Sequence, residues 1–182
     1  MAIIMESPRT GKKPQIHESV YIAPNAVIIG DVIIEEGSNI WFGAVLRGDW
    51  GTITIGRDTS IQENVTIHIE MGSSVKIGSH CIIGHHAMIH GPTEIGDGCI
   101  VGIGAKVLHR SKLGEGCVLA AGAVLLNKEI PSRSLAVGIP AFVKREGVYK
   151  GKLEGMKTSK EYFKNGQAYK EFFESNPDLS KV

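Results

Sequence analysis

An aliphatic residue recurs every six positions over most of the chain, and this period constrains the fold more than any other feature. An α-helix cannot keep such residues on one side, because its faces recur every 3.6 residues. A short strand followed by a turn can keep the period, and three such units close one coil of a triangular parallel β-helix. The repeat contains 18 hexads, which begin at Ile16, Ile22, Ile28, Ile34, Ile40, Leu46, Ile55, Ile61, Ile67, Ile77, Ile83, Ile89, Ile95, Val101, Val107, Leu113, Leu119 and Leu125.

With three hexads per coil, the repeat predicts an all-β solenoid of about six triangular coils within residues 1–145. Two intervals are longer than six residues: nine residues separate Leu46 from Ile55, and ten separate Ile67 from Ile77. Insertions in a solenoid are expected to leave from one place on the prism, so we expect loops there, with the coils on either side in register.

Residues 146–182 are expected to form a linker and a C-terminal helix. The sequence Thr-Ser-Lys-Glu at 158–161 has the pattern of a capping box, and aromatic residues follow it at roughly helical spacing. Asn176 and Pro177 end the pattern. We therefore predict a helix over about 159–175 that packs on the flank of the prism.

Composition excludes several classes of protein. The formal charge is +1 and the pI about 7.8, so no overall field attracts nucleic acid or an anionic membrane. The apolar runs are too short to span a bilayer and the first residues lack a signal peptide, which makes the cytoplasm the expected location. Cys81, Cys99 and Cys117 are spaced by 18 residues, so we expect a buried stack of free thiols.

The register of the hexads places histidines on neighbouring coils. Successive coils of such a prism lie ~4.8 Å apart. His68 and His90 are 22 residues apart, which is one coil once the four inserted residues are removed, and Arg47 belongs to the same column. A second face places Gln62 in one column, and Glu63 and His85 in the next.

Two imidazoles on adjacent coils can share one tetrahedral metal ion. His85 lies on another face, where a rotated neighbouring subunit could present it as the third ligand. The register therefore suggests a cyclic oligomer with shared sites, and we expect Trp41 and Phe42 to pack between subunits.

The motifs around these residues resemble those of the γ-class carbonic anhydrases, often labelled ferripyochelin-binding-like proteins. They are the segment 39–49 (NIWFGAVLRGD), Ile61-Gln62-Glu63-Asn64 with His68, and Gly84-His85 followed by 88–92 (MIHGP). The resemblance covers about residues 10–145 and implies a left-handed β-helix that forms a homotrimer. It also implies zinc bound by His68, His85 and His90, two from one subunit and one from the next, and reversible hydration of CO2 to bicarbonate by a metal-bound hydroxide.

The resemblance also implies roles for five further residues. Arg47 and Asp49 correspond to an interface ion pair that orients the site, and Gln62 to a glutamine near the zinc-bound solvent. Glu63 stands where the family usually has Asp, and would hold Gln62 or relay a proton. Tyr169 corresponds to a tyrosine on the C-terminal helix that faces the metal. The loop after His68 is short and lacks the acidic insertion that carries a proton shuttle in the best-studied members.

Two other functions remain open at this point. Many hexapeptide-repeat proteins are acyltransferases that use an acyl-CoA, and the segment 138–141 (GIPA) resembles the way their repeats end. The second alternative is a non-catalytic trimeric scaffold or binding protein held together by the metal.

The same three histidines could also accept Fe2+ or Co2+ in place of Zn2+.

Overall fold

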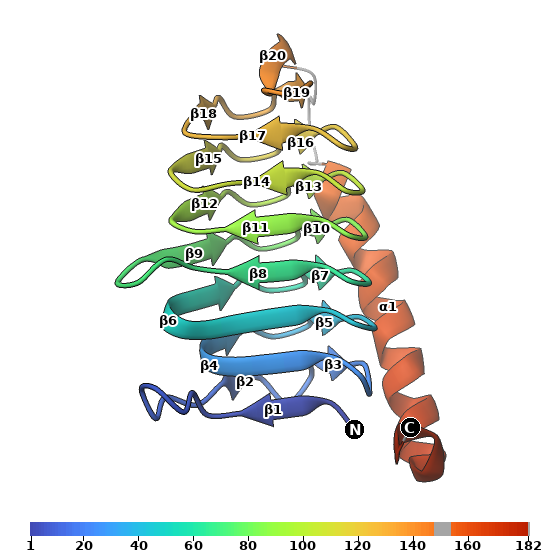
Figure 1. Ribbon diagram of the computed structural model, residues 1–182. Helices are drawn as coiled ribbons and strands as arrows, with labels where there is room; N and C mark the ends of the chain where they lie inside the picture. The colour runs from blue at the N-terminus through green and yellow to red at the C-terminus, as the bar shows by residue number, and fades with distance from the viewer. Residues whose placement is uncertain (148–153, 182) are drawn as a thin grey trace.

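The structure, a computed structural model, describes residues 1–147 and 154–181 as a parallel β-solenoid with one long helix beside it (Figure 1). Each coil contributes one strand to each of three faces, so that each face holds seven parallel strands. The first face consists of β1 (Ile3–Met5), the first half of β4 (Val27–Ile34), the first half of β6 (Val45–Ile55), β8 (Thr66–His68), β11 (Met88–His90), β14 (Lys106–Val107) and β17 (Val124–Leu125). The second face consists of β3 (Tyr21–Ile22), β5 (Asn39–Ile40), β7 (Ser60–Ile61), β10 (Ile82–Ile83), β13 (Ile100–Val101), β16 (Val118–Leu119) and β19 (Leu135–Val137). The third face consists of β2 (Gln15–Ile16), the second halves of β4 and β6, β9 (Ser74–Ile77), β12 (Thr93–Ile95), β15 (Ser111–Leu113) and β18 (Glu129–Ile130). Strand β20 (Phe142–Arg145) pairs antiparallel with β19 at the end of the second face.

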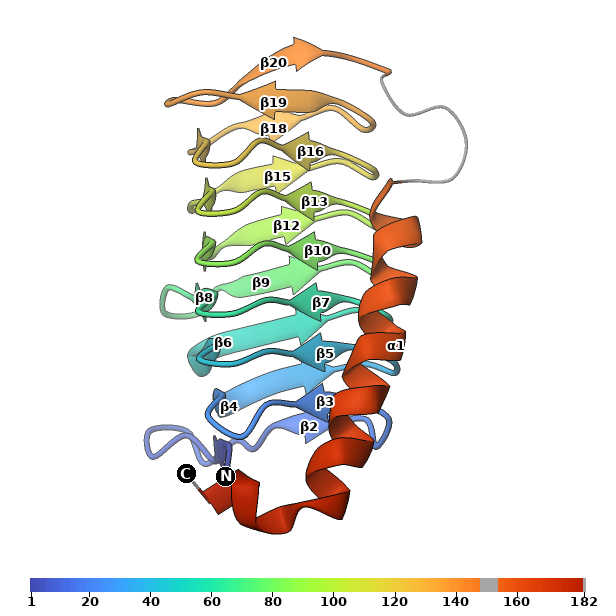
Figure 2. The same cartoon turned by 90° about the vertical axis from the view of Figure 1, so that its right-hand side faces the viewer.

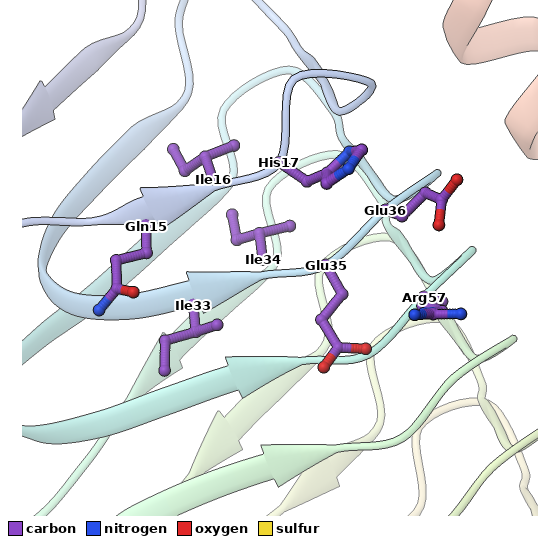
Figure 3. Close-up of a pocket in the computed structure, with 8 residues that line it drawn as sticks. All are labelled: Gln15, Ile16, His17, Ile33, Ile34, Glu35, Glu36 and Arg57. Carbon is purple, nitrogen blue, oxygen red and sulfur yellow. The ribbon is translucent and has the colours of Figure 1, made fainter.

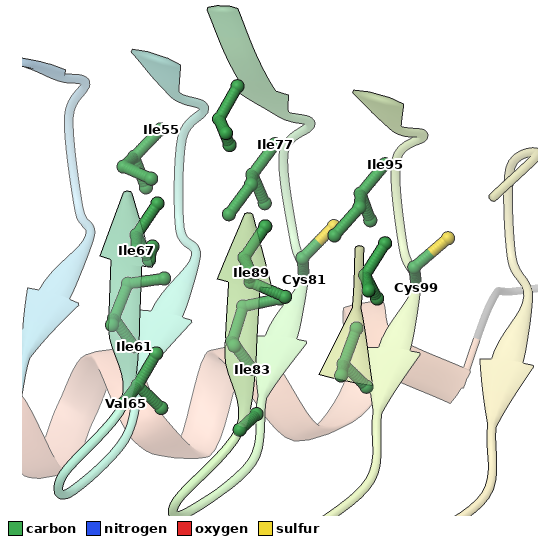
Figure 4. Close-up of a cluster of buried hydrophobic side chains, with 14 of the residues drawn as sticks. Ile55, Ile61, Val65, Ile67, Ile77, Cys81, Ile83, Ile89, Ile95 and Cys99 are labelled. Carbon is green, nitrogen blue, oxygen red and sulfur yellow. The ribbon is translucent and has the colours of Figure 1, made fainter. Parts of the chain in front are cut away.

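The aliphatic residues of the hexads point inward and stack from coil to coil. Ile61, Ile83 and Val101 are direct partners on consecutive coils, and all three are fully buried. Figure 4 shows Ile61 and Ile83 together with the neighbouring columns, Ile67 with Ile89, and Ile55 with Ile77 and Ile95. Burying one such side chain contributes roughly 1.5–3 kcal/mol, so the repeat itself stabilises the prism. The predicted left-handed parallel β-helix is confirmed.

The solenoid has seven coils, one more than the 18 hexads predict. The missing coil is divided between the two ends of the repeat. Ile4 pairs with Ile28 and adds a strand before the first hexad, while Ile130 and Ala136 add two strands after the last one. The sequence pattern hides this coil because a loop separates Ile4 from Ile16, and alanine replaces the large aliphatic residue at position 136.

The two insertions lie at the edge between the first and third faces, but only the second forms a loop. Residues 70–73 form a loop within the connection from β8 to β9, as expected. The first insertion instead continues as strand in β6, so the prediction of a loop there is wrong. Strand β4 runs beside it round the same edge, and the two come close at Gly30, whose φ is +82°. A Cβ at this position would lie 2.4 Å from the carbonyl oxygen of Gly48.

Helix α1 (Glu154–Ser175) lies along the second face, where it packs against β3, β5, β7 and β10 (Figure 2). It begins five residues before the predicted start, and the hydroxyl of Ser159 donates to the carbonyl of Met156 instead of capping the helix. Gly155 explains the earlier start, because it allows the helix backbone to approach the carbonyl oxygen of Gly98. A short 3-10 helix, η1 (Pro177–Lys181), follows. The predicted linker lies mostly in residues 148–153, outside the described residues, and the domain division at 145 stays a prediction.

Aromatic side chains hold α1 on the prism. Trp41 is buried between Tyr21 of β3 and the helix residues Tyr162 and Tyr169, with ring centroids 5.3–6.1 Å apart. The expectation that Trp41 packs between subunits is therefore wrong, because the helix of its own chain covers it. Phe172, in contrast, is half exposed on the outer side of the helix.

The three cysteines are free and buried, as predicted. The thiols of Cys81 and Cys99 donate to the carbonyls of Gly96 and Gly114 on the next coil. The adjacent Cys99 thiol and burial raise the pKa of Cys117, so this thiol stays protonated at neutral pH. None of the helices in the described part of the chain is long and apolar enough to cross a membrane.

Candidate functional site

The predicted histidine column exists on the first face. His68 and His90 end strands β8 and β11 and are direct partners across the sheet, and Arg47 of β6 pairs with His68. The ring centroids of the two histidines are 5.5 Å apart. They lie where the first face meets the third, at the edge that also carries the 70–73 loop, and we call this the loop edge.

Asp49 connects the arginine to the histidine at the loop edge. It accepts a hydrogen bond from Nη1 of Arg47 at 2.6 Å, and its other oxygen is 3.3 Å from Nε2 of His68. Burial alone would raise the pKa of Asp49, but the hydrogen bond and charge of Arg47 outweigh it and lower this pKa. Asp49 is therefore ionised at neutral pH and orients both neighbours.

His68 is held in its neutral form. Burial lowers its pKa, and the charge of Arg47 lowers it further, against the opposing effect of Asp49. A neutral imidazole is the form that binds a metal ion, because the lone pair must be free of its proton. His90, the next residue of the column, lies beside it with a partly exposed side chain.

His85 lies at a different edge, in the turn between β10 and β11 where the second face meets the first, which we call the His85 edge. Its Nδ1 is 2.6 Å from Oε2 of Glu63, and its backbone N–H donates to the side-chain oxygen of Gln62 at 3.1 Å. Gln62 is buried, whereas Glu63 and His85 are partly exposed. A carboxylate on Nδ1 directs the lone pair to Nε2, which is the usual arrangement of a metal-binding histidine.

The chain thus brings the predicted site residues together in two separate groups. Arg47, Asp49, His68 and His90 form the group at the loop edge, and Gln62, Glu63 and His85 form the group at the His85 edge. Among the described residues, no set of three histidine, cysteine or acidic side chains is placed to hold a metal ion. Each group nevertheless has donors that suit a metal ion, with neutral imidazole at one edge and a carboxylate-oriented imidazole at the other.

Tyr169 lies on α1, partly exposed, and its ring contacts Trp41 at 5.3 Å and Phe42 at 6.1 Å between centroids. Phe42 shares the column of Glu63 and His85: the backbone N–H of Asn64 donates to Phe42, and that of His86 donates to Glu63. Tyr169 therefore belongs to the His85 edge. It also lines a shallow, mainly apolar pocket with Asn165, Ala168 and Phe172.

Two residues beside the candidate site were missed from the sequence. Trp50 follows Asp49 directly and approaches the ring of His68, with centroids 6.5 Å apart. The guanidinium of Arg9 lies over Trp50 at 4.9 Å from the ring centroid. The Arg-x-Asp motif could have pointed to Trp50, but no signal pointed to Arg9, because its loop lies outside the hexads.

A separate cavity of about 420 Å³ lies on the third face near the N-terminal coils (Figure 3). It contains none of the predicted site residues. Its lining residues come from β2, β4 and the turns that follow the third-face strands: Gln15, Ile16, His17, Ile33, Ile34, Glu35, Glu36 and Arg57.

Comparisons with known proteins agree with the hexapeptide repeat. The family described as "Bacterial transferase hexapeptide (six repeats)" matches residues 13–48 and 92–127. The "Carbonic anhydrase" of Geobacillus kaustophilus is 36% identical over 163 residues, which is 90% of each chain. The "Probable carbonic anhydrase" of Methanocaldococcus jannaschii is 49% identical over 131 residues, 72% of this chain and 82% of that one.

Longer relatives and solved structures extend the comparison. Three mitochondrial γ carbonic anhydrases of Arabidopsis thaliana are 40–42% identical over 88 residues, so the match spans about a third of their length. A crystal structure of a hexapeptide transferase family protein from Anaplasma phagocytophilum superimposes with a TM-score of 0.85 at 34% identity. That match covers 92% of this chain and 98% of the other.

Proposed function

Because the chain belongs to the γ carbonic anhydrase family of hexapeptide-repeat proteins, we propose that it is a zinc-dependent carbonic anhydrase that hydrates CO2 reversibly to bicarbonate. One observation carries the proposal. His68 and His90 pair at the loop edge, while Glu63 orients His85 at the His85 edge, so the ligands are divided as a shared site requires.

The complete site forms between two copies of the chain in a homotrimer. A threefold axis places the His85 edge of each subunit beside the loop edge of the next. Each of the three sites then contains His68 and His90 of one subunit and His85 of its neighbour. We place the trimer in the cytoplasm, because three buried free cysteines are typical of a reducing compartment.

His68, His90 and the His85 of a neighbouring subunit would hold Zn2+ through neutral imidazoles, and the ion would supply a nucleophile for CO2 at neutral pH by lowering the pKa of water toward ~7. Fe2+ or Co2+ can take the same ligands, with occupancy decided by availability. Glu63 fixes the tautomer and orientation of His85 through the 2.6 Å contact with Nδ1. Asp49 contacts His68 at the other ring nitrogen, Nε2, and orients its ring, while Arg47 keeps Asp49 ionised.

Gln62 and Tyr169 orient the reacting molecules. The side-chain oxygen of Gln62 already accepts the backbone N–H of His85, so its amide NH2 group remains to donate a hydrogen bond to substrate. Tyr169 is held by Trp41 and Phe42 beside the same edge, and we assign its hydroxyl to the same site. CO2 and bicarbonate are the small molecules that these groups recognise.

A second candidate function is acyl transfer from an acyl-CoA. It is favoured by the close superposition on the hexapeptide transferase family protein described above. Calorimetric titration with acetyl-CoA distinguishes the two: a carbonic anhydrase is expected to give no binding heat, and micromolar binding supports the transferase.

The direct test is CO2 hydration measured by stopped flow on anaerobically purified protein of known metal content. We expect activity in proportion to bound metal, and its loss in His90→Ala. His109→Ala, which removes a histidine from the turn between β14 and β15, is the matched control and is expected to keep full activity. Metal at one per subunit without activity would leave a metal-bound trimeric scaffold, and absence of metal would contradict the site assignment.

A further inference from the structure

Three segments that are far apart in the sequence meet beside His68. They are the loop between β1 and β2, the end of the first-face part of β6, and the loop between β8 and β9, and both loops project from the loop edge in Figures 1 and 2. Nη2 of Arg9 donates to Sδ of Met71 at 3.5 Å, and the guanidinium lies 4.9 Å above the ring of Trp50. Trp50 in turn approaches His68.

The position of Arg9 is fixed by its own loop. The hydroxyl oxygen of Ser7, a buried residue, accepts the backbone N–H groups of Arg9 and Thr10, and the backbone carbonyl of Ser7 accepts the N–H of Gly11. Lys12 then fastens the end of the loop through an ion pair with Asp31 at 2.5 Å. The guanidinium is therefore held over Trp50 by two attachments, one through the loop backbone and one through the Met71 sulfur.

The other positively charged side chains near this edge form ion pairs with carboxylates. Lys12 pairs with Asp31, Lys13 with Glu6, and Arg47 with Asp49. Among the residues that the structure describes, no carboxylate lies within ion-pair distance of Arg9. Arg9 is connected to the histidine column through Trp50, whose ring centroid lies 4.9 Å from the guanidinium and 6.5 Å from the ring of His68.

We propose that Arg9, held over Trp50 beside His68, attracts the bicarbonate ion to the site. This inference rests on the proposed function and deepens it. CO2 is neutral and bicarbonate is an anion, so an unneutralised guanidinium there stabilises only the charged species. The planar guanidinium can also donate two parallel hydrogen bonds to a carboxylate-like group while its face stays on the indole ring.

The test compares wild type with Arg9→Gln, Arg9→Lys and Lys13→Gln at constant ionic strength. The readout is the inhibition constant of bicarbonate in the hydration reaction. We expect Arg9→Gln to raise this constant about two- to fivefold, the range expected for loss of one exposed ion-pair contact. Arg9→Lys restores the charge and is expected to recover most of the affinity. Lys13→Gln removes the same charge from the same loop, but from a side chain already paired with Glu6, and is expected to leave the constant unchanged.

A second readout is independent of activity. Trp41 is buried and Trp50 is 40% exposed, so quenching of tryptophan fluorescence reports mainly on Trp50. We expect Arg9→Gln to reduce quenching by iodide, an anion, and to leave quenching by neutral acrylamide unchanged, which also shows that the loop has kept its place. An unchanged bicarbonate constant in Arg9→Gln, with wild type active, overturns this inference and leaves the proposed function standing. Wild-type protein that binds zinc but does not hydrate CO2 overturns both.

Discussion

Glu63 is the residue on which the orientation of His85 depends. Its carboxylate accepts from Nδ1, so Glu63→Gln replaces a charged acceptor by a neutral amide and weakens the hold on the metal-binding tautomer. We expect zinc affinity to fall about 10- to 100-fold, measured by competition with a chromophoric chelator. Glu63→Asp keeps the charge and is the control, with most of the affinity retained. Equal affinity in wild type and Glu63→Gln would show that the carboxylate does not orient the ligand.

Asp31 makes the stability of the fold depend on pH. Burial raises the pKa of Asp31, but hydrogen bonds from Lys12 and Thr52 and the charge of Lys12 outweigh it, and the net pKa is lowered. A carboxyl with a lowered folded-state pKa stabilises the fold above its unfolded pKa of about 3.9, and this contribution disappears as pH falls through the folded value. Asp31→Asn is therefore expected to cost about 1 kcal/mol at pH 7 and less at pH 2.

Denaturant unfolding of both proteins at the two pH values tests this expectation. Lys13→Gln, whose partner Glu6 is half exposed, is the control and is expected to change stability by less than about 0.5 kcal/mol. A difference between wild type and Asp31→Asn that is the same at both pH values would contradict the assignment.

Some glycine positions in the coils have no room for a side chain, whereas others do. Gly30 combines a φ of +82° with a Cβ position that would overlap the backbone of Gly48, so Gly30→Ala is expected to destabilise the fold by about 2 kcal/mol or more. Gly104 also has a positive φ, but open space surrounds its Cβ position. Asn64 adopts a similar φ of 59° two coils earlier, so Gly104→Asn is expected to change stability by less than about 1 kcal/mol. Melting temperatures of the two variants test this difference in stability. A lower melting temperature for Gly104→Asn than for Gly30→Ala would contradict it.

The regular elements were predictable because each hexad carries its own signal. Ile61, Ile83 and Val101 mark the inward position of consecutive coils, and removal of the four inserted residues brought His68 opposite His90. The seventh coil was not predicted because a loop separates its first strand, at Ile4, from the first hexad, and another of its strands has alanine, Ala136, at the inward position. The start of α1 escaped because Gly155 allows a tertiary contact that a local capping pattern does not reveal.

The six-residue period does not predict contacts between segments that lie far apart in the sequence. The Arg-x-Asp motif located Arg47 and Asp49, and the 2.6 Å hydrogen bond between them agrees with the expected ion pair. Arg9 and Trp50 are 41 residues apart in the sequence, and the loop that carries Arg9 lies outside the hexads. Their contact is therefore visible only in the folded chain. Trp41 was expected to pack between subunits, but α1 of its own chain covers it.

The two groups of candidate site residues lie on different edges of one prism. The coils between them are fixed by parallel pairing on every face, so the two edges cannot close on each other within a chain. Oligomerisation through a threefold axis is the symmetric way to unite them. In the proposed trimer, each metal ion is therefore held jointly by two copies of the chain.

Subunit mixing tests this claim most directly. Neither His85→Ala nor the double variant His68→Ala, His90→Ala can complete a site in a trimer of its own kind, so both are expected to lack zinc. When the two are unfolded together in equal amounts and refolded, every mixed trimer regains one intact site of its three, and about a quarter of all sites should bind zinc. Recovery of zinc and CO2 hydration to that level is the predicted result. Mixed trimers without zinc, or full zinc in His85→Ala alone, would contradict a site shared between subunits.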